Sequence, residues 1–586
     1  MQRKRVILFV SVMMIILSIL IVRLAQIQLF ETKHFTNRDI NLISQSVAQR
    51  SKEIAIDAER GNFLDRDGKQ LTVAYKTVLI LFPFLKDIEW DVSSVAEILK
   101  VDKNQLRQKV QAIKNPIVFG DREPFILSNE QMEEINQLEI PGVFAVRKSY
   151  PIYERPAEQL LGIANRDFLL TQRYPNKHLS NITRLGATGM EKSFDELLSG
   201  EGETKLIYHV DGKGRPLFGS NVKYVHPANP FYPLNIRTTL DFEWQQRMEM
   251  LVDKNEVTKG GMVLIDIEDN SVVAMVSRPK VNPVNPFAHG EEGTNNFMVQ
   301  NQVLGSIFKT VIAAAAIDYG LDAKSRMFDC NQSINGEIDK NYQYGMLNFK
   351  DSFARSCNYT FATVGKELMS IEPLVMDSYA NKLGLSIKVG WQGDFYHLKG
   401  FQQMADEEQG QVFSDPQNRK DTNLIALTSI GQLDVRSTPL AVANMMATIA
   451  RGGEKQMVRV ASQLEYKNGT KVKSFQPKRV VGKNIKPYTA ISLQKLLLEV
   501  VNHDLGTGRQ LQNVPYQVAG KSGTGETGKK LNGQELENKW FAGYFPYDNP
   551  RYALVTVRLD AKSTDPSPLS LFADIVKEIH RLDHST

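Results

Sequence analysis

An uncharged apolar run near the N-terminus constrains this chain more than any other feature. Residues 6–22 carry no charge, basic residues occupy positions 3–5, and apolar residues resume at Leu24 and Ala25 after Arg23. A run of this length is typical of a membrane-spanning helix, and basic residues mark its cytoplasmic side. We therefore predict a cytoplasmic tail at residues 1–5, a single transmembrane anchor at residues 6–25, and the bulk of the chain outside the cytoplasm.

A cleavable signal peptide is the alternative interpretation of this run. Signal peptides end in a small-x-small cleavage site. No such site follows, and Leu24, Ile27 and Leu29 extend the apolar pattern instead. The pattern favours an uncleaved anchor, and we find no second segment that is long and apolar enough to span a bilayer.

The chain is long enough for more than one domain, because its 586 residues exceed the size at which one hydrophobic core stops growing. Residues 26–235 have a mixed pattern that predicts an irregular α+β module, and the prolines between 230 and 233 mark its end. A second module follows at residues 236–586. There we expect a helix at 242–257, a hairpin of strands 262–267 and 272–276, a strand at 552–559 and a helix at 570–579.

Composition excludes several kinds of function. The formal charge of +5 is a small difference between 71 basic and 66 acidic side chains, and no long basic run is present, so nucleic acid is a poor candidate for a partner. The two cysteines, Cys330 and Cys357, form no CxxC pair and no cysteine-histidine cluster. We therefore expect neither a structural zinc site nor a disulfide framework.

A serine and a lysine open the most apolar helix of the second module. Ser306 and Lys309 precede residues 310–317, a run of Ala, Ile and Val that stops near Gly320. On a helix the two side chains share a face, so the lysine amine could take the proton of the serine hydroxyl. Burial would lower the lysine pKa, and the free N–H groups of the helix N-terminus suit an oxyanion. The second S-x-x-K, at Ser220 and Lys223, lies in a polar stretch that we interpret as a loop.

A second polar pair lies 50 residues beyond Ser306. Ser356 and Asn358 supply a hydroxyl and an amide that could relay a proton to a leaving amine and hold a substrate carbonyl. Ser333 and Asn335 also fit S-x-N, but they sit in a polar stretch close to Ser306, and Ser356 is favoured.

Cys357, between Ser356 and Asn358, falls on a series of apolar residues four apart. The series favours core packing for Cys357, with a disulfide to Cys330 as the less favoured alternative. Its members are Phe349, Phe353, Cys357 and Phe361.

A third polar group follows a predicted strand at residues 516–520. Lys521, Ser522 and Thr524 place an amine and two hydroxyls on a strand edge, which suits the binding of a carboxylate. Gly523 would let an extended peptide approach the backbone closely.

The ordered set S-x-x-K, S-x-N and K-[ST]-G resembles the active-site motifs of penicillin-binding proteins and β-lactamases. The likeness extends over nearly the whole chain and is to class B penicillin-binding proteins of the Gram-positive type. Further stretches similar to the family lie at residues 60–68, 148–151, 186–191, 431–432, 438–440 and 540–544. The chain departs from the family at Leu304, Ile307 and Leu433, where proline, threonine and glycine are usual. These departures leave the reacting groups in place.

This resemblance implies an α+β fold: a membrane anchor, a pedestal or dimerisation domain at 26–235, and a transpeptidase domain at 236–586 whose antiparallel sheet is flanked by helices. It implies that Ser306 attacks the D-Ala-D-Ala bond of a peptidoglycan stem peptide, with Lys309 as general base. Ser356 and Lys521 would then shuttle the proton and Asn358 would orient the substrate amide. Ser522 and Thr524 would hold the terminal carboxylate.

The resemblance also implies partners. They are the donor and acceptor stem peptides, β-lactams as inhibitors, and a glycan polymerase of the SEDS family in the membrane. No metal or organic cofactor is required. Two rival functions remain open at this point: a β-lactamase or β-lactam sensor, which shares the motifs, and a non-catalytic scaffold for wall synthesis.

Overall fold

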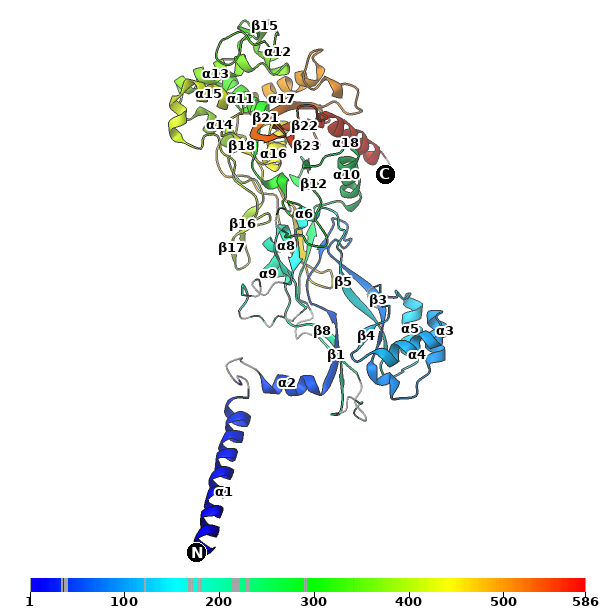
Figure 1. The fold of residues 1–586 in the computed structure, drawn as a ribbon. Coiled ribbons are helices and arrows are strands. Elements are labelled where there is room, and N and C mark those ends of the chain that lie inside the picture. The colour runs from blue at the N-terminus through cyan, green and yellow to red at the C-terminus, as the bar shows by residue number, and fades with distance from the viewer. Residues whose placement is uncertain are drawn as a thin grey trace.

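A computed structural model gives the fold of the chain. It describes residues 2–584 except 33–34, 36–40, 121–122, 167–169, 171, 176, 178, 180–181, 213–214, 216, 218–221, 227–230, 289, 291 and 341. The molecule is elongated, with the N-terminal helix at one end, a pedestal in the middle and a larger helix-and-sheet module at the other end (Figure 1).

The predicted anchor is a separate helix. Helix α1, Gln2–Ala25, continues through a short π-helical turn, Gln26–Phe30, and its apolar side chains are exposed over the whole length. Within the described residues, it is the one helix long and apolar enough to cross a membrane. The expectation of a single apolar span is confirmed, although the helix is longer than residues 6–25.

The pedestal consists of two small sheets with helices on one side. Strand β3 pairs with β4 and β5, and helices α3, α4 and α5 bury their apolar faces against this sheet (Figure 1). Strand β8 joins β1 to β9 in a second antiparallel sheet. The bounds are α2 Leu42–Gln49, β1 Ser51–Asp57, β3 Val73–Leu81, α3 Val92–Leu99, α4 Lys103–Ala112, β4 Ile117–Val118, α5 Asn129–Gln137, β5 Val143–Pro151, β8 Thr204–His209 and β9 Lys223–Val225.

A compact region of short elements connects the pedestal to the larger module. Its bounds are α6 Glu158–Leu161, β6 Ala164–Asn165, β7 Leu185–Gly186, α8 Gly189–Ser193 and α9 Asp195–Leu198. A four-stranded sheet lies across the same junction, in the order β2 Phe63–Leu64, β10 Asn235–Thr238, β19 Ala461–Glu465 and β20 Lys471–Ser474. Because β2 pairs with β10, the two modules share a sheet, and the predicted boundary after residue 235 falls inside β10.

The larger module is built on a five-stranded antiparallel sheet in the order β12, β11, β23, β22, β21. Its strands are β11 Gly260–Asp266, β12 Ser271–Arg278, β21 Ala519–Leu531, β22 Gln534–Phe545 and β23 Tyr552–Ala561. Met262 and Leu264 pack under α10 Phe242–Lys254 and α18 Pro568–Asp583. Val263 and Ile265 face the opposite core, which contains α11 Lys309–Tyr319, α16 Pro439–Ala450 and α17 Pro487–Asn502. The predicted sheet flanked by helices is confirmed.

Most of the remaining elements of this module surround the end of the sheet where β21 lies, whereas β16 and β17 lie beside α8 and α9 near the junction (Figure 1). Their bounds are β13 Gln302–Val303, β14 Met327–Asp329, β15 Met346–Asn348, α12 Phe349–Ala354, α13 Asn358–Ile371, α14 Val375–Lys382, β16 Gln392–Phe395, β17 Leu398–Gln402, α15 Thr422–Ser429 and β18 Arg436–Ser437.

Four local predictions for this module are confirmed with small shifts. The 242–257 helix is α10, and the side chain of Asp241 caps it by accepting from the Trp244 N–H (3.0 Å). The hairpin is β11 and β12, the 552–559 strand is β23 and the 570–579 helix is α18. The predicted strand at 516–520 is displaced, because β21 begins only at Ala519 and includes Lys521 to Thr524 within the ladder.

Candidate active site

Ser306 lies on a tight turn in front of a buried helix. The turn is a 3-10 segment, Gly305–Phe308, and α11 begins at Lys309 rather than at Ser306 as the sequence suggested. The helix is buried over nearly all its length, and Lys309 itself is completely buried. Ser306 is half-buried while its neighbours on both sides are buried, so the turn presents one partly accessible hydroxyl above a dry interior.

Two glycines let other chain segments contact this turn. Gly305 adopts φ +54°, and a Cβ built on it would lie 2.0 Å from the carbonyl oxygen of Thr524. Its N–H donates to the Gly431 carbonyl (2.9 Å), and a Cβ on Gly431 would lie 1.9 Å from the Gly305 oxygen. The backbone of the turn is therefore clamped between β21 and the loop after α15 at distances that only glycine permits.

Lys309 is the centre of a hydrogen-bond cluster. Its amine donates to the Ser356 carbonyl (2.7 Å), the Ser356 Oγ (3.1 Å) and the Asn358 Oδ1 (2.6 Å). Burial, and secondarily the charge of Lys521, lower the pKa of Lys309 well below its usual value. The site therefore favours a neutral amine at this position, as a general base requires.

Ser356 and Asn358 occupy a break between two helices. Helix α12 ends at Ala354 and α13 begins at Asn358, and Ser356 lies between them at φ +61°, a left-handed conformation that is unusual for a serine. The apolar residues four apart do pack in the core, but they belong to two helices and not to one.

Cys357 does lie in the core, as the pattern favoured, but it also forms a disulfide with Cys330, the less favoured alternative. Both cysteines are buried within the apolar cluster. Apolar packing and a disulfide require the same burial, so the pattern around Cys357 could not distinguish them. The bond ties the loop that carries Ser356 and Asn358 to the segment after α11.

Lys521 approaches the same cluster from the sheet. It lies in β21, is completely buried, and donates to the Ser356 Oγ (3.0 Å) and to the Ser522 carbonyl (3.2 Å). Burial lowers the pKa of Lys521 to about 7. Ser356 thus joins the two lysines through one hydroxyl.

Ser522, Gly523 and Thr524 have different environments along β21. The Ser522 hydroxyl donates to the Thr507 Oγ1 (2.7 Å), and Thr524 is exposed. A Cβ on Gly523 would lie 2.7 Å from the Ile307 Cγ1 and 2.8 Å from the Leu304 oxygen. The close approach that requires glycine here is therefore to the Ser306 turn, whereas the sequence had suggested an approaching peptide.

Two contacts at this site were not identified from the sequence. Thr507, between Gly506 and Gly508, accepts a hydrogen bond from Ser522. It lies in none of the motifs that the sequence analysis identified. Gln432 donates to the Thr524 carbonyl (3.3 Å) and accepts from the Glu526 N–H (2.9 Å). The sequence did offer one signal for Gln432, which is its position in residues 431–432, a stretch similar to the family.

Of the two alternative serines, only Ser333 lies among the described residues, and no hydrogen bond joins it to this cluster. Ser333 lies in a turn where its Oγ accepts from the Asn335 N–H (3.4 Å). Ser220 lies outside the described residues, so the structure does not test its interpretation as a loop. The cluster thus combines two buried amines and one shared hydroxyl, and Lys309 directly follows the turn that carries Ser306.

Comparisons with known families agree with the two modules. Residues 260–580 match the penicillin-binding protein transpeptidase domain, and residues 55–229 match the penicillin-binding protein dimerisation domain. The first match covers more than half of the chain.

Similar proteins cover most of the chain at low identity. Stage V sporulation protein D of Bacillus subtilis is 24% identical over 559 residues, which cover 91% of this chain and 79% of the relative. Peptidoglycan D,D-transpeptidase FtsI of Escherichia coli K12 is 22% identical over 534 residues, or 87% and 80% of the two chains.

Two solved structures share the fold. Penicillin-binding protein 2X of Streptococcus thermophilus superposes with a TM-score of 0.67 at 18% identity, covering 90% of this chain and 80% of the other. A chain from work on the structural coordination of polymerization and crosslinking by a peptidoglycan synthase complex gives 0.66 at 20% identity, covering 98% and 97%.

Proposed function

This chain belongs to the penicillin-binding protein transpeptidase family, in its class B form, and from that membership we propose that it cross-links peptidoglycan stem peptides through an acyl-enzyme on Ser306. The observation that carries the proposal is the pair of buried amines, Lys309 and Lys521, on the hydroxyl of Ser356. This arrangement supplies a base, a relay and an acid beside one accessible serine.

In the acylation step Lys309, in its neutral form, takes the proton of Ser306 as the Oγ attacks the carbonyl of the D-Ala-D-Ala bond. The Ser306–acyl bond forms, and the carbon–nitrogen bond to the terminal D-Ala breaks. Ser356, bonded to both lysines, gives its hydroxyl proton to the leaving amine and regains one from the lysine pair, in which Lys309 holds the proton taken from Ser306 and Lys521 completes the shuttle. Asn358 orients both Lys309 and the substrate amide.

The sheet supplies the binding surface for the peptide. Strand β21 is an edge strand of the five-stranded sheet, so a stem peptide could add to its free edge in extended form. The hydroxyls of Ser522 and Thr524 would bind the terminal carboxylate, with Thr507 orienting Ser522. An acceptor amine then attacks the acyl carbonyl and releases Ser306.

Labelling with fluorescent penicillin tests the reaction. The wild type should be labelled, Ser306→Ala should not, and Ser333→Ala and Ser220→Ala should behave as the wild type. Mass spectrometry should locate the adduct on the peptide that contains Gly305 to Lys309, and the adduct should persist for many minutes because no residue is assigned to activate water against it. Rapid release of hydrolysed penicillin would favour a β-lactamase, and failure of any β-lactam to bind folded protein would favour a scaffold.

The orientation in the membrane forms part of the proposal. Basic residues at 3–5 place the N-terminus in the cytoplasm and the modules outside. Protease added to intact protoplasts should digest the bulk of the chain, and protection of the C-terminal module would contradict this orientation.

We also propose that α1 and the pedestal bind a glycan polymerase of the SEDS family. Support comes from the fold shared with a chain of a peptidoglycan synthase complex. A chain lacking residues 1–235 should fail to co-purify with the polymerase. Equal recovery of the short and full-length chains would place the contact elsewhere.

A further inference from the structure

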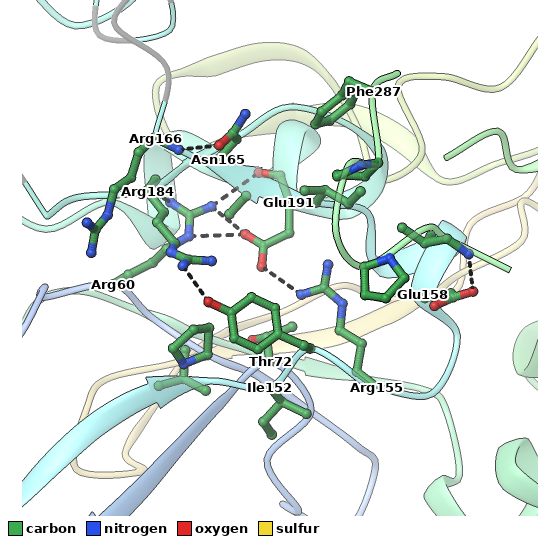
Figure 2. Close-up of a pocket in the computed structure, with 18 of the residues that line it drawn as sticks. Arg60, Thr72, Ile152, Arg155, Glu158, Asn165, Arg166, Arg184, Glu191 and Phe287 are labelled. Carbon is green, nitrogen blue, oxygen red and sulfur yellow. Dashed lines mark hydrogen bonds and ion pairs between the residues drawn. The ribbon is translucent and has the colours of Figure 1, made fainter. Parts of the chain in front are cut away.

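A cavity of about 550 Å³ lies at the junction of the two modules, away from the Ser306 turn, and we call it the junction cavity. Segments of the pedestal form one side, with Arg60, Arg155, Arg184 and Glu191, and residues 281–287 of the transpeptidase module form the other (Figure 2). This volume lies in the range of sites for small organic ligands. Any molecule bound there would contact both modules.

The lining is rich in guanidinium groups, four against two carboxylates. Arg60 is already satisfied, because it is bonded to Glu191 and donates to Asp195 (2.8 Å), Ser199 (3.0 Å) and the Arg184 carbonyl (3.0 Å). The positive charge of Arg60 is therefore balanced by Asp195, with which it forms an ion pair.

Arg155 is not satisfied to the same degree. Its side chain is only 11% exposed, and its single ion pair among the described residues, to the Glu191 Oε1, is long at 3.9 Å. The same carboxylate binds Arg60 through its other oxygen. Burial lowers the pKa of Arg155, with Arg60 and Arg184 adding to this effect, although Glu191 and Glu158 oppose it. An added anion would give the Arg155 guanidinium a closer partner of opposite charge.

Two more guanidinium groups face the cavity without a carboxylate partner in the part of the chain that the structure describes. Arg184 donates to the Tyr153 hydroxyl (2.9 Å), a neutral group. Arg166 is exposed at the rim. Glu158, the other lining carboxylate, is engaged by the Val281 N–H (2.7 Å).

Apolar groups complete the wall opposite the arginines. Pro283, Pro286 and the partly exposed ring of Phe287 lie on the transpeptidase side. A neighbouring cavity of about 640 Å³ shares Ile152, Tyr153 and Arg155 with the first, so Arg155 is reached from both. The combination of cationic and apolar surface suits an organic anion better than an inorganic one.

We propose that the junction cavity binds a small organic anion, whose carboxylate or phosphate group lies between Arg155 and Arg184 and whose body packs on Phe287 and the two prolines. Guanidinium groups pair with either anion in bidentate geometry. Because the ligand would touch both modules, its binding should hold them in one arrangement.

Calorimetric titration of the full-length protein in detergent tests the proposal. The probes are a muramyl tripeptide with free carboxylates, the same compound with its carboxylates amidated, glycerol 3-phosphate and inorganic phosphate. The protein is first treated with penicillin, which acylates Ser306, so that binding at the Ser306 site does not contribute to the measured heat. Binding of the free tripeptide but not of the amidated one identifies a carboxylate source, and binding of glycerol 3-phosphate identifies a phosphate source.

Substitutions then locate the site. Arg184→Gln and Arg155→Gln should each weaken binding by about tenfold or more. Arg107→Gln, on the exposed face of α4, should leave the affinity unchanged. The side chain of Arg184 is half-buried and, among the described residues, hydrogen-bonds only Tyr153, so its variant should fold even if that of Arg155 does not. The proposal would be overturned if neither the free tripeptide nor glycerol 3-phosphate bound, if the free and amidated tripeptides bound equally, or if the wild type and Arg184→Gln had equal affinity.

Discussion

Lys309 and Lys521 reach one hydroxyl from two sides, with their amines 3.1 and 3.0 Å from the Ser356 Oγ. Two buried ammonium groups this close repel each other, and neither has a carboxylate partner among the described residues. Their titrations are therefore coupled, and at neutral pH the site favours a state in which at least one amine is neutral. The first two predictions follow from this coupling.

Acylation by penicillin should accelerate with rising pH as the amine of Lys309, whose pKa burial lowers well below its usual value, loses its proton. A lysine with a lowered pKa is neutral above that pKa, and only the neutral amine can accept the proton of Ser306. Second-order acylation rates between pH 5.5 and 9 should show this rising limb. Lys309→Arg should abolish labelling at every pH, since a guanidinium remains charged. A flat profile would contradict the role of the two amines.

Lys521→Met should inactivate the enzyme and yet stabilise it at low pH. With its pKa lowered to about 7, Lys521 binds fewer protons in the folded than in the unfolded state between pH 7 and about 10.4, so its contribution to stability rises with pH in that window. Below pH 7 the folded protein holds a charged amine in the core. Replacement by methionine should raise stability at pH 6 by about 1 kcal/mol or more, as measured by urea unfolding.

Lys530→Met is the matched control for this prediction. Lys530 lies exposed on the same strand, β21, where methionine should change stability little at any pH. If Lys521→Met were less stable than the wild type at pH 6, the hydrogen bonds of Lys521 would stabilise the fold by more than the burial of its charge destabilises it.

Gly305→Ala should remove activity through a steric clash. The added Cβ would lie 2.0 Å from the Thr524 oxygen, so either the Ser306 turn or β21 must move. We expect a loss of more than about 2 kcal/mol in unfolding free energy and loss of penicillin labelling. Gly320→Ala separates clash from backbone strain, since Gly320 has φ +70° with nothing within 4 Å of its Cβ position. It should lower stability by only about 1 kcal/mol and keep labelling.

Leu433→Gly should be tolerated or mildly stabilising. Leu433 stands where the family usually has glycine, and it adopts φ +61°, which disfavours a leucine. The glycine variant should gain up to about 1 kcal/mol and retain its acylation rate, while a clear loss would indicate that the leucine side chain packs usefully.

The candidate site residues could be proposed from the sequence because each occurs in a short motif, and the motifs keep their order along the chain. What joins them was not predictable. Ser306, Ser356 and Lys521 come from a turn, a helix break and a strand, and only the folded chain brings them together. The helix pattern around Cys357 concealed the break, because the apolar residues on each side continue the same spacing across it.

The pedestal also contains a contact that the sequence did not predict. Arg60 and Glu191 each lie in a stretch similar to the family, 131 residues apart, and nothing in either stretch indicates that they form a buried ion pair. The shared sheet at the junction was missed as well. Its first strand, β2, has two residues, too few to produce a periodic pattern.

Removal of the disulfide should weaken both stability and catalysis. Cys330 and Cys357 close a loop of 27 residues, and the entropy of such a loop in the unfolded chain corresponds to about 3 kcal/mol. The double variant Cys330→Ser, Cys357→Ser should lose roughly this amount of unfolding free energy, as measured by urea unfolding.

Because Cys357 lies between Ser356 and Asn358, which both hold Lys309, we also expect penicillin acylation of the double variant to slow by about tenfold. A reductant should shift the wild type toward the variant and leave the variant unchanged. If the reductant destabilised both proteins equally, the loss would have a cause other than this bond.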